Sequence, residues 1–210
     1  MKVPLSVIIQ WVIMLLLIGY FLIIGRKIRK IPRKNQNFWE MVVAKFINIV
    51  ETNIGEKYKG LSVYFLVLSI FLFLCNMTGL IGIKNPTTDY SFCFALGIMN
   101  FFLIQYFAIK RNGVKGYFMG FLKPMSLMFP LNLMERVLLP ISLSLRLFGN
   151  IFAAYLILEI IYEGLISISP VAAIGIPIPF HLFFDIFDGT LQVIIFILLS
   201  MINMKIICEH

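Results

Sequence analysis

The stretch LSVIIQWVIMLLLIGYFLII at residues 5–24 is followed directly by GRKIRKIPRKNQ at residues 25–36. The first stretch is 20 residues without a charge, and as a helix it rises about 30 Å, the thickness of the hydrocarbon core of a membrane. The second stretch carries six cations, and such runs stay on the cytoplasmic or matrix face. Together they predict a retained transmembrane helix with its N-terminus outside, because a cleaved signal peptide would carry its cations before the apolar run.

The composition of the whole chain points the same way. Of its 210 residues, 60% are hydrophobic and 13% are charged, whereas a soluble domain is about half apolar and about one quarter charged. This excludes a disordered chain, a coiled coil and almost any soluble enzyme. The net charge of +8 is explained by basic loops beside a membrane, and not by nucleic acid. Long continuous apolar runs predict helices and not a barrel.

The rest of the chain divides into three regions. Residues 38–56 alternate apolar and charged side chains at helical spacing, which predicts an amphipathic helix on the membrane surface. Residues 61–109 hold two apolar spans joined by a neutral turn, and the next loop is basic through Lys110, Arg111, Lys115 and Lys123.

Residues 131–204 predict two long helices. The first, over 131–162, reaches roughly 48 Å, so it either breaks at Pro140 or lies steeply tilted. A last helix is expected from His181 to Asn203. We therefore expect one all-α integral membrane domain over 1–210, with about five membrane-embedded helices and one surface helix, the last two helices long and inclined.

Arg146 is the one cation between Arg136 and Lys205. An arginine in the middle of a membrane helix is costly and indicates function, although an ion pair with a neighbouring helix is the structural alternative. Ser142 and Asn150 lie four residues to either side and share its face. Beside them, Gly149 and Ala153 form a small-residue pair, which lets another helix approach or serves ordinary packing.

The last predicted helix carries polar residues three and four apart, namely Asp185, Asp188 and Gln192. Two ionised carboxylates inside a membrane need pairing, hydration or protonation, and a water-filled path would provide this. His181 precedes Asp185 by four residues. A metal site from these side chains is the alternative, but further ligands are lacking. Glu159 and Glu163 either line the same path or end a helix in solvent.

The stretch SLSLRLFGN at 142–150, Gln192 forty-two residues after Asn150, and GLIGIKNPTTD at 79–89 resemble subunit a of the F-type ATP synthase over nearly the whole chain. The resemblance implies that Arg146 is the arginine facing the ring of c subunits, with Asn150 and Gln192 near it. Asp185 would line an ion half-channel, and Asp89 matches an acid of the second loop. Where many members have an acid, this chain has Tyr155, so Asp185, Asp188 or Glu159 would substitute.

The resemblance implies a non-catalytic stator subunit that couples proton or sodium flow to rotation and ATP synthesis. Its partners would be the c-subunit ring, the peripheral-stalk b subunits, the other synthase subunits and the bilayer, with no nucleic acid, metal or cofactor. A bacterial cell membrane is expected, with the mitochondrial inner membrane as the alternative. A stand-alone channel or secondary transporter is the competing function, but the internal symmetry of such transporters is not visible.

Overall fold

The computed structural model describes residues 5–26, 34–120, 129–168 and 172–209. Within these ranges every regular element is a helix, and five helical segments are long and apolar enough to cross a membrane. The expected all-α membrane fold is thereby confirmed. Residues 27–33 of the basic run, and Lys123 of the second basic loop, lie outside the described residues.

Helix α1 (Leu5–Arg26) is apolar on all sides, and Ile13 is its one buried residue. A helix with this pattern suits a position bordered by lipid. The amphipathic helix α2 (Lys34–Ile54) begins earlier than the sequence suggested. The two helices meet through aromatic side chains, where the Trp39 indole donates a hydrogen bond to the Tyr20 hydroxyl at 3.2 Å.

The hairpin consists of two membrane-length helical segments and the short turns between them. Its elements are η1 (Glu56–Leu61), α3 (Ser62–Met77), η2 (Thr78–Ile81), η3 (Pro86–Thr88) and α4 (Tyr90–Gly120). Helix α4 changes direction at Gly113, whose φ of 69° lies in the left-handed region that glycine adopts without strain.

Helix α5 (Phe129–Ile168) is continuous over 40 residues and does not break at Pro140. A proline inside a membrane helix is tolerated where neighbouring helices accommodate the disturbed backbone. Here α4 comes very close, because a Cβ atom on Gly97 would lie 2.7 Å from the Pro140 carbonyl oxygen. A helix of this length reaches about 60 Å, roughly twice the hydrocarbon core, so it has to run obliquely to the membrane normal.

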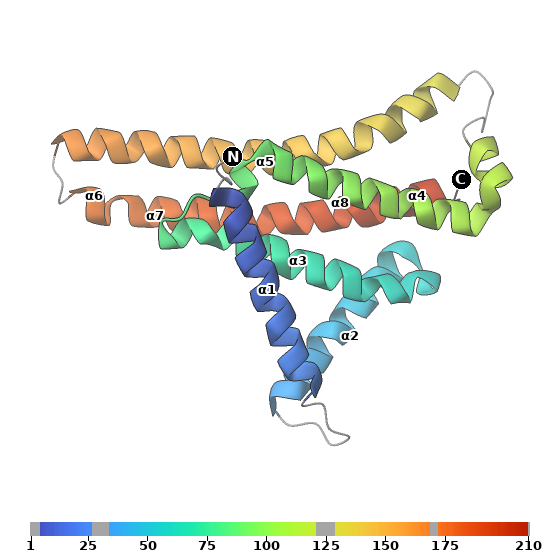
Figure 1. Ribbon diagram of the computed structural model, residues 1–210. Helices are drawn as coiled ribbons and strands as arrows, with labels where there is room; N and C mark the ends of the chain where they lie inside the picture. The colour runs from blue at the N-terminus through green and yellow to red at the C-terminus, as the bar shows by residue number, and fades with distance from the viewer. Residues whose placement is uncertain (1–4, 27–33, 121–128, 169–171, 210) are drawn as a thin grey trace.

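The last membrane segment is not one regular helix. It consists of α6 (Ala172–Gly175), α7 (Pro177–His181), η5 (Leu182–Asp188) and α8 (Gly189–Glu209), and η5 is a π-helical turn. The expected helix from His181 to Asn203 is present, but residues 182–188 at its start are π-helical, which the sequence did not predict. Figure 1 shows α8 lying along α5, with both helices running across the direction of α1.

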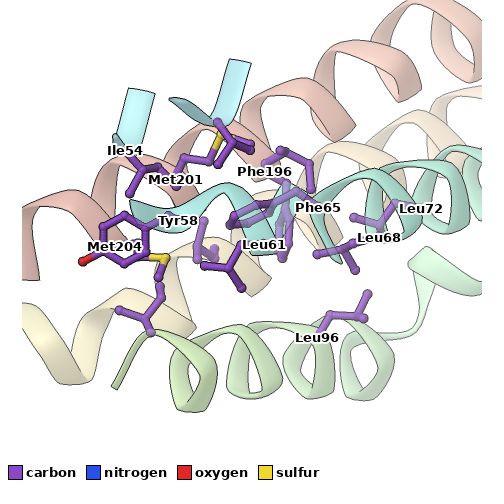
Figure 2. Close-up of a cluster of buried hydrophobic side chains, with 14 of the residues drawn as sticks. Ile54, Tyr58, Leu61, Phe65, Leu68, Leu72, Leu96, Phe196, Met201 and Met204 are labelled. Carbon is purple, nitrogen blue, oxygen red and sulfur yellow. The ribbon is translucent and has the colours of Figure 1, made fainter. Parts of the chain in front are cut away.

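The core lies where α2, η1, α3, α4, α5 and α8 meet, and it is made of aliphatic, aromatic and methionine side chains (Figure 2). Phe65, Leu72, Ile104, Leu147 and Met201 are among its fully buried members. The buried amide of Asn100 and the hydroxyl of Ser200 hydrogen-bond across α4 and α8. This core fixes the inner faces of α5 and α8 and leaves the outer face of α5 open.

We expect Gly97→Ala to destabilise the protein by about 1–3 kcal/mol. The added methyl group would collide with the Pro140 carbonyl oxygen, which can move away only if helix α5 moves. The measurement is the thermal aggregation midpoint of the detergent-solubilised protein. Gly19→Ala is the matched control, since nothing lies within 4 Å of a Cβ atom there. Equal midpoints for the two variants would show that α4 and α5 do not approach this closely.

Candidate functional site

Arg146 lies on the outer face of α5, away from the core. Its side chain is exposed, as are Ser142, Gly149, Asn150 and Ala153 around it. A Cβ atom on Gly149 would meet nothing within 4 Å. The small residues therefore pack against no helix of the described chain, and they leave a shallow, open surface beside the guanidinium.

Within the ranges that the structure describes, the guanidinium of Arg146 has no hydrogen bond and no ion pair. The ion pair with a neighbouring helix, which the sequence left as the structural alternative, is not seen there. An exposed and unpaired charge on a membrane helix is costly against lipid. The charge therefore needs an anion that these residues do not supply.

A hydrogen bond joins the two long helices one turn from Arg146. The side-chain nitrogen of Asn150 donates to Oε1 of Gln192 on α8 at 2.8 Å. Gln192 is 2% exposed, and its own Nε2 is buried without a partner in the described part of the chain. Arg146 lies one turn before this contact on α5. The resemblance, and not residue spacing, groups Gln192 with Arg146 and Asn150.

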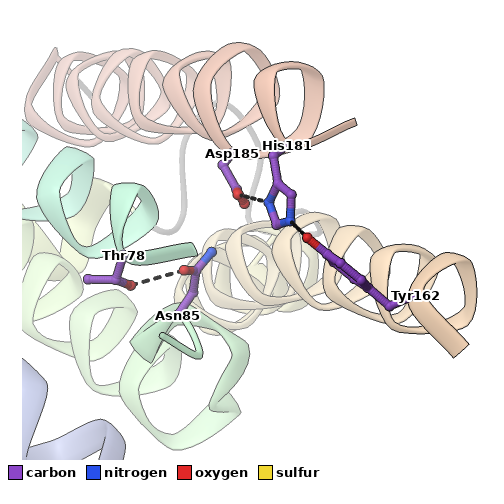
Figure 3. Close-up of polar contacts among 5 residues, drawn as sticks. All are labelled: Thr78, Asn85, Tyr162, His181 and Asp185. Carbon is purple, nitrogen blue, oxygen red and sulfur yellow. Dashed lines mark hydrogen bonds and ion pairs between the residues drawn. The ribbon is translucent and has the colours of Figure 1, made fainter. Parts of the chain in front are cut away.

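A second polar cluster forms at the π-helical turn, where α5 ends beside α7 (Figure 3). Nδ1 of His181 lies 2.6 Å from Oδ2 of Asp185, and Nε2 of the same ring lies 3.0 Å from the hydroxyl of Tyr162 on α5. Asp185 is 5% exposed, while the His181 side chain is 22% exposed. The imidazole therefore stands between a buried carboxyl group and a phenol on another helix.

Gly79 of η2 provides the room for the Asp185 carboxyl group. A Cβ atom at this glycine would lie 2.6–2.8 Å from the carboxyl atoms of Asp185, closer than any stable contact. Any side chain at position 79 would push the carboxyl group out of its place. The turn after the second span thus forms one side of the cluster, although no residue spacing in the sequence links it to Asp185.

Buried amides hold the π-helical turn against the hairpin. Asn76 donates to the carbonyl oxygen of Gly189 at 3.0 Å and accepts from the Thr87 hydroxyl at 2.9 Å. Close by, the Thr78 hydroxyl donates to Asn85 at 2.9 Å (Figure 3). Buried polar groups that satisfy each other in this way fix a single arrangement of the backbone, and this arrangement positions Asp185.

The remaining candidate acids have different surroundings. Asp188 is half-buried. Glu159 is exposed and accepts a hydrogen bond from Tyr155 at 3.4 Å, and Glu163 is exposed on the next turn of α5. Asp89 instead caps the start of α4 through the backbone of Ser91 and accepts from Ser6 of α1.

Across the described ranges no three His, Cys, Asp or Glu residues lie close enough to hold a metal ion. The residues that sequence reasoning missed are Tyr162, Gly79 and Asn76. They come from three other elements, and only the tertiary structure brings them to the π-helical turn.

The contact between Asn150 and Gln192 can be tested by cross-linking in membranes. We expect Asn150→Cys combined with Gln192→Cys to form a cross-link with a short bifunctional thiol reagent, because their side chains touch. Asn150→Cys combined with Ile194→Cys is the control, since Ile194 is 48% exposed and lies on the opposite face of α8. Electrophoresis separates the products, and equal yields for both pairs would contradict the described crossing of α5 and α8.

Comparison with known proteins gives one consistent result. The family model for the ATP synthase A chain matches residues 7–205. ATP synthase subunit a of Moorella thermoacetica is 33% identical over 93% of this chain and 86% of its own length. That of Listeria monocytogenes is 35% identical over 90% and 86%, and the sodium-ion-specific subunit a of Propionigenium modestum is 30% identical over 97% and 73%. The chain therefore belongs to the ATP synthase subunit a family, the ion-translocating subunits of the synthase's membrane sector.

Proposed function

We propose that Arg146 faces the ring of c subunits and that ions reach and leave this ring through two separate aqueous half-channels. The observation that carries the proposal is the exposed guanidinium of Arg146, which has no partner within the described ranges. Gly149 and Ala153 beside it are exposed, which suits close approach of another helix. A stand-alone channel or transporter is not favoured, because subunit a works within the synthase.

The chemistry follows from the cost of charge in lipid. A carboxyl group on a rotating ring can cross lipid only when a proton or a bound cation neutralises it. Beside a fixed cation the ionised carboxylate is favoured, because an opposite charge lowers the pKa of an acid. The ring therefore releases its ion at Arg146. Arginine suits this role because, unlike lysine, it stays charged at any working pH.

Two offset half-channels turn this exchange into rotation. An ion that enters from one side neutralises a ring carboxylate, which then travels through lipid before it meets the other half-channel. The positive charge of Arg146 blocks a direct leak between the two paths. Each charge that crosses yields about 2.3 kcal/mol per 100 mV, so several ions together supply the energy of one ATP.

Residues of the second cluster are our candidates for one half-channel. Asp185 is buried beside His181, Asp188 is half-buried, and Glu159 and Glu163 are exposed along α5. This gradient from exposed to buried acids supports a path from solvent toward Gln192. Ser142 lies one turn from Arg146 on the open face and is a candidate for the other path, whereas Asp89 caps the start of α4.

Other subunits of the synthase supply the functions that this chain lacks. Nucleotide chemistry belongs to other synthase subunits, since the sequence contains no phosphate-binding GxxxxGK[ST] loop. The exposed sides of α1 suit lipid and the b subunits of the peripheral stalk. The bacterial relatives favour a bacterial cell membrane over the mitochondrial inner membrane.

Arg146→Ala should abolish ion-driven ATP synthesis by the assembled complex in membrane vesicles, because ring carboxylates would no longer be held ionised at the stator. Leu145→Ala is the control: it shortens the neighbouring side chain, which is 50% exposed, without removing a charge, and it should leave most of the rate. Coupled synthesis by the Arg146→Ala complex would eliminate the proposed function.

Asp185→Asn should slow ion flow through the assembled membrane sector without dissociating the complex, because it removes the ionisable group and keeps its shape. Passive proton uptake by vesicles stripped of the soluble sector measures the flow, and gel filtration measures assembly. Glu56→Gln, at the distant start of η1, provides the control. Flow equal to that of the unaltered protein would remove Asp185 from the half-channel.

A further inference from the structure

We propose that Lys84 is a positioning residue for ion transport, because its ammonium group holds the hairpin turn (residues 78–89) against helix α5 through the face of the Tyr155 ring. The inference rests on the proposed function, in which α5 and η5 beside this turn carry the acids of one half-channel. Lys84 itself touches no ion in this role. It acts through the turn, which keeps α5 and η5 in place.

The contact joins two residues that are distant in the chain. Nζ of Lys84 lies 4.9 Å from the centroid of the Tyr155 ring, and a cation is attracted to the negative face of an aromatic ring within about 6 Å of its centroid. The hydroxyl group at the edge of the same ring donates to Oε1 of Glu159 at 3.4 Å. Tyr155 therefore holds a cation on its face and contacts a carboxylate at its edge.

Lys84 stands apart from the other cations of the chain. It is the only lysine or arginine between residues 60 and 109, and none occurs between residues 147 and 204. The turn lies at the opposite end of α4 from Lys110 and Arg111, so it belongs to the membrane side that is poor in cations. Lys84 is exposed and forms no ion pair within the described ranges. The Tyr155 ring is thus the contact that holds its ammonium group.

Hydrogen bonds on both sides of Lys84 make the hairpin turn rigid. The backbone N–H of Ile83 donates to the carbonyl oxygen of Thr78 at 3.2 Å. The hydroxyl group of Thr78 donates to Asn85 at 2.9 Å (Figure 3). Because both neighbours of Lys84 are tied to Thr78, holding the lysine side chain on α5 holds the whole turn.

The turn contacts both long membrane segments. On one side, Gly79 lies against the carboxyl group of Asp185 on η5, and on the other side Lys84 reaches α5. Tyr155 follows Arg146 by nine residues, about two and a half turns of a regular helix, so it lies on the opposite side of α5. The contact therefore supports α5 from behind and leaves the surface beside Arg146 clear.

An aromatic ring holds the lysine without using a carboxylate. An ion pair would neutralise one of the acids near this end of the membrane segments, whereas the ring face leaves them available to mobile cations. Loss of the ring contact would have two effects. The ammonium group would turn toward these acids, and the turn could move away from α5. The acids are Asp89, Glu159, Glu163, Asp185 and Asp188.

The first test uses the complete synthase in proteoliposomes, with the rate of ion-driven ATP synthesis as the readout. Lys84→Met keeps most of the length of the side chain and removes its charge. It should slow synthesis about two- to five-fold, because an exposed cation–π contact of about 0.5–1 kcal/mol changes the population of the held turn by this factor. Lys84→Arg should keep the rate, since a guanidinium also binds aromatic faces. Lys57→Met, at an exposed lysine of η1, is the matched control.

The second test varies the ring at position 155. Tyr155→Phe keeps the aromatic face and should keep most of the rate. Phenylalanines that carry one, two and three ring fluorine atoms, incorporated at the same position, should lower the rate in steps, because fluorine withdraws electrons from the ring face and weakens its attraction for a cation. In the Lys84→Met background the same series should have no effect. A ring that serves packing alone would not respond to its electron density.

Three results would overturn the role of Lys84: synthesis by Lys84→Met at the rate of Lys57→Met, synthesis by Lys84→Arg as slow as that of Lys84→Met, or a fluorine series without a trend. The Arg146→Ala complex, measured in parallel, separates this from failure of the proposed function. If Arg146→Ala loses coupling while Lys84→Met keeps its rate, the role of Lys84 alone is refuted. If Arg146→Ala keeps coupling, the proposed function itself falls.

Discussion

The guanidinium of Arg146 is the main constraint on the rest of the structure, because it is exposed on a membrane helix and has no ion pair within the described ranges. Such a charge is costly against lipid. In the proposed function an acidic group of the ring compensates it, which requires that Arg146 faces outward and that the surface beside it stays clear. The core achieves this by burying the opposite sides of α5 and α8 and leaving Gly149 and Ala153 exposed next to the charge. In the proposed function, the length of α5 would give the ring an extended surface.

The two polar clusters connect different parts of the structure. At the crossing of α5 and α8, the hydrogen bond between Asn150 and Gln192 joins α5, which carries Arg146, to α8, which follows the turn that holds Asp185 and Asp188. At the π-helical turn, Asp185 lies between an imidazole and a glycine of the hairpin. The hairpin therefore does more than cross the membrane, because its turn and the Asn76 amide set where the carboxyl group lies.

Local backbone irregularity marks the functional region. A π-helical turn adds backbone within a helix and often occurs at functional sites. Here it separates Asp185, which faces the hairpin, from Gln192, which faces α5. In a regular helix the two would share a face seven residues apart. The irregular turn thus lets one segment contact both the hairpin, through Asp185, and α5, through Gln192.

The sequence by itself determined the membrane class, the helical fold and Arg146 with its local neighbours, since apolar run length, charge and helical spacing are properties of adjacent residues. It also placed His181 beside Asp185, because residues four apart lie on the same face of a helix. It did not predict the continuity of α5 through Pro140, the π-helical turn, or the places of Tyr162, Gly79 and Asn76. Those depend on contacts between segments distant in the chain, where packing and buried hydrogen bonds outweigh local preference.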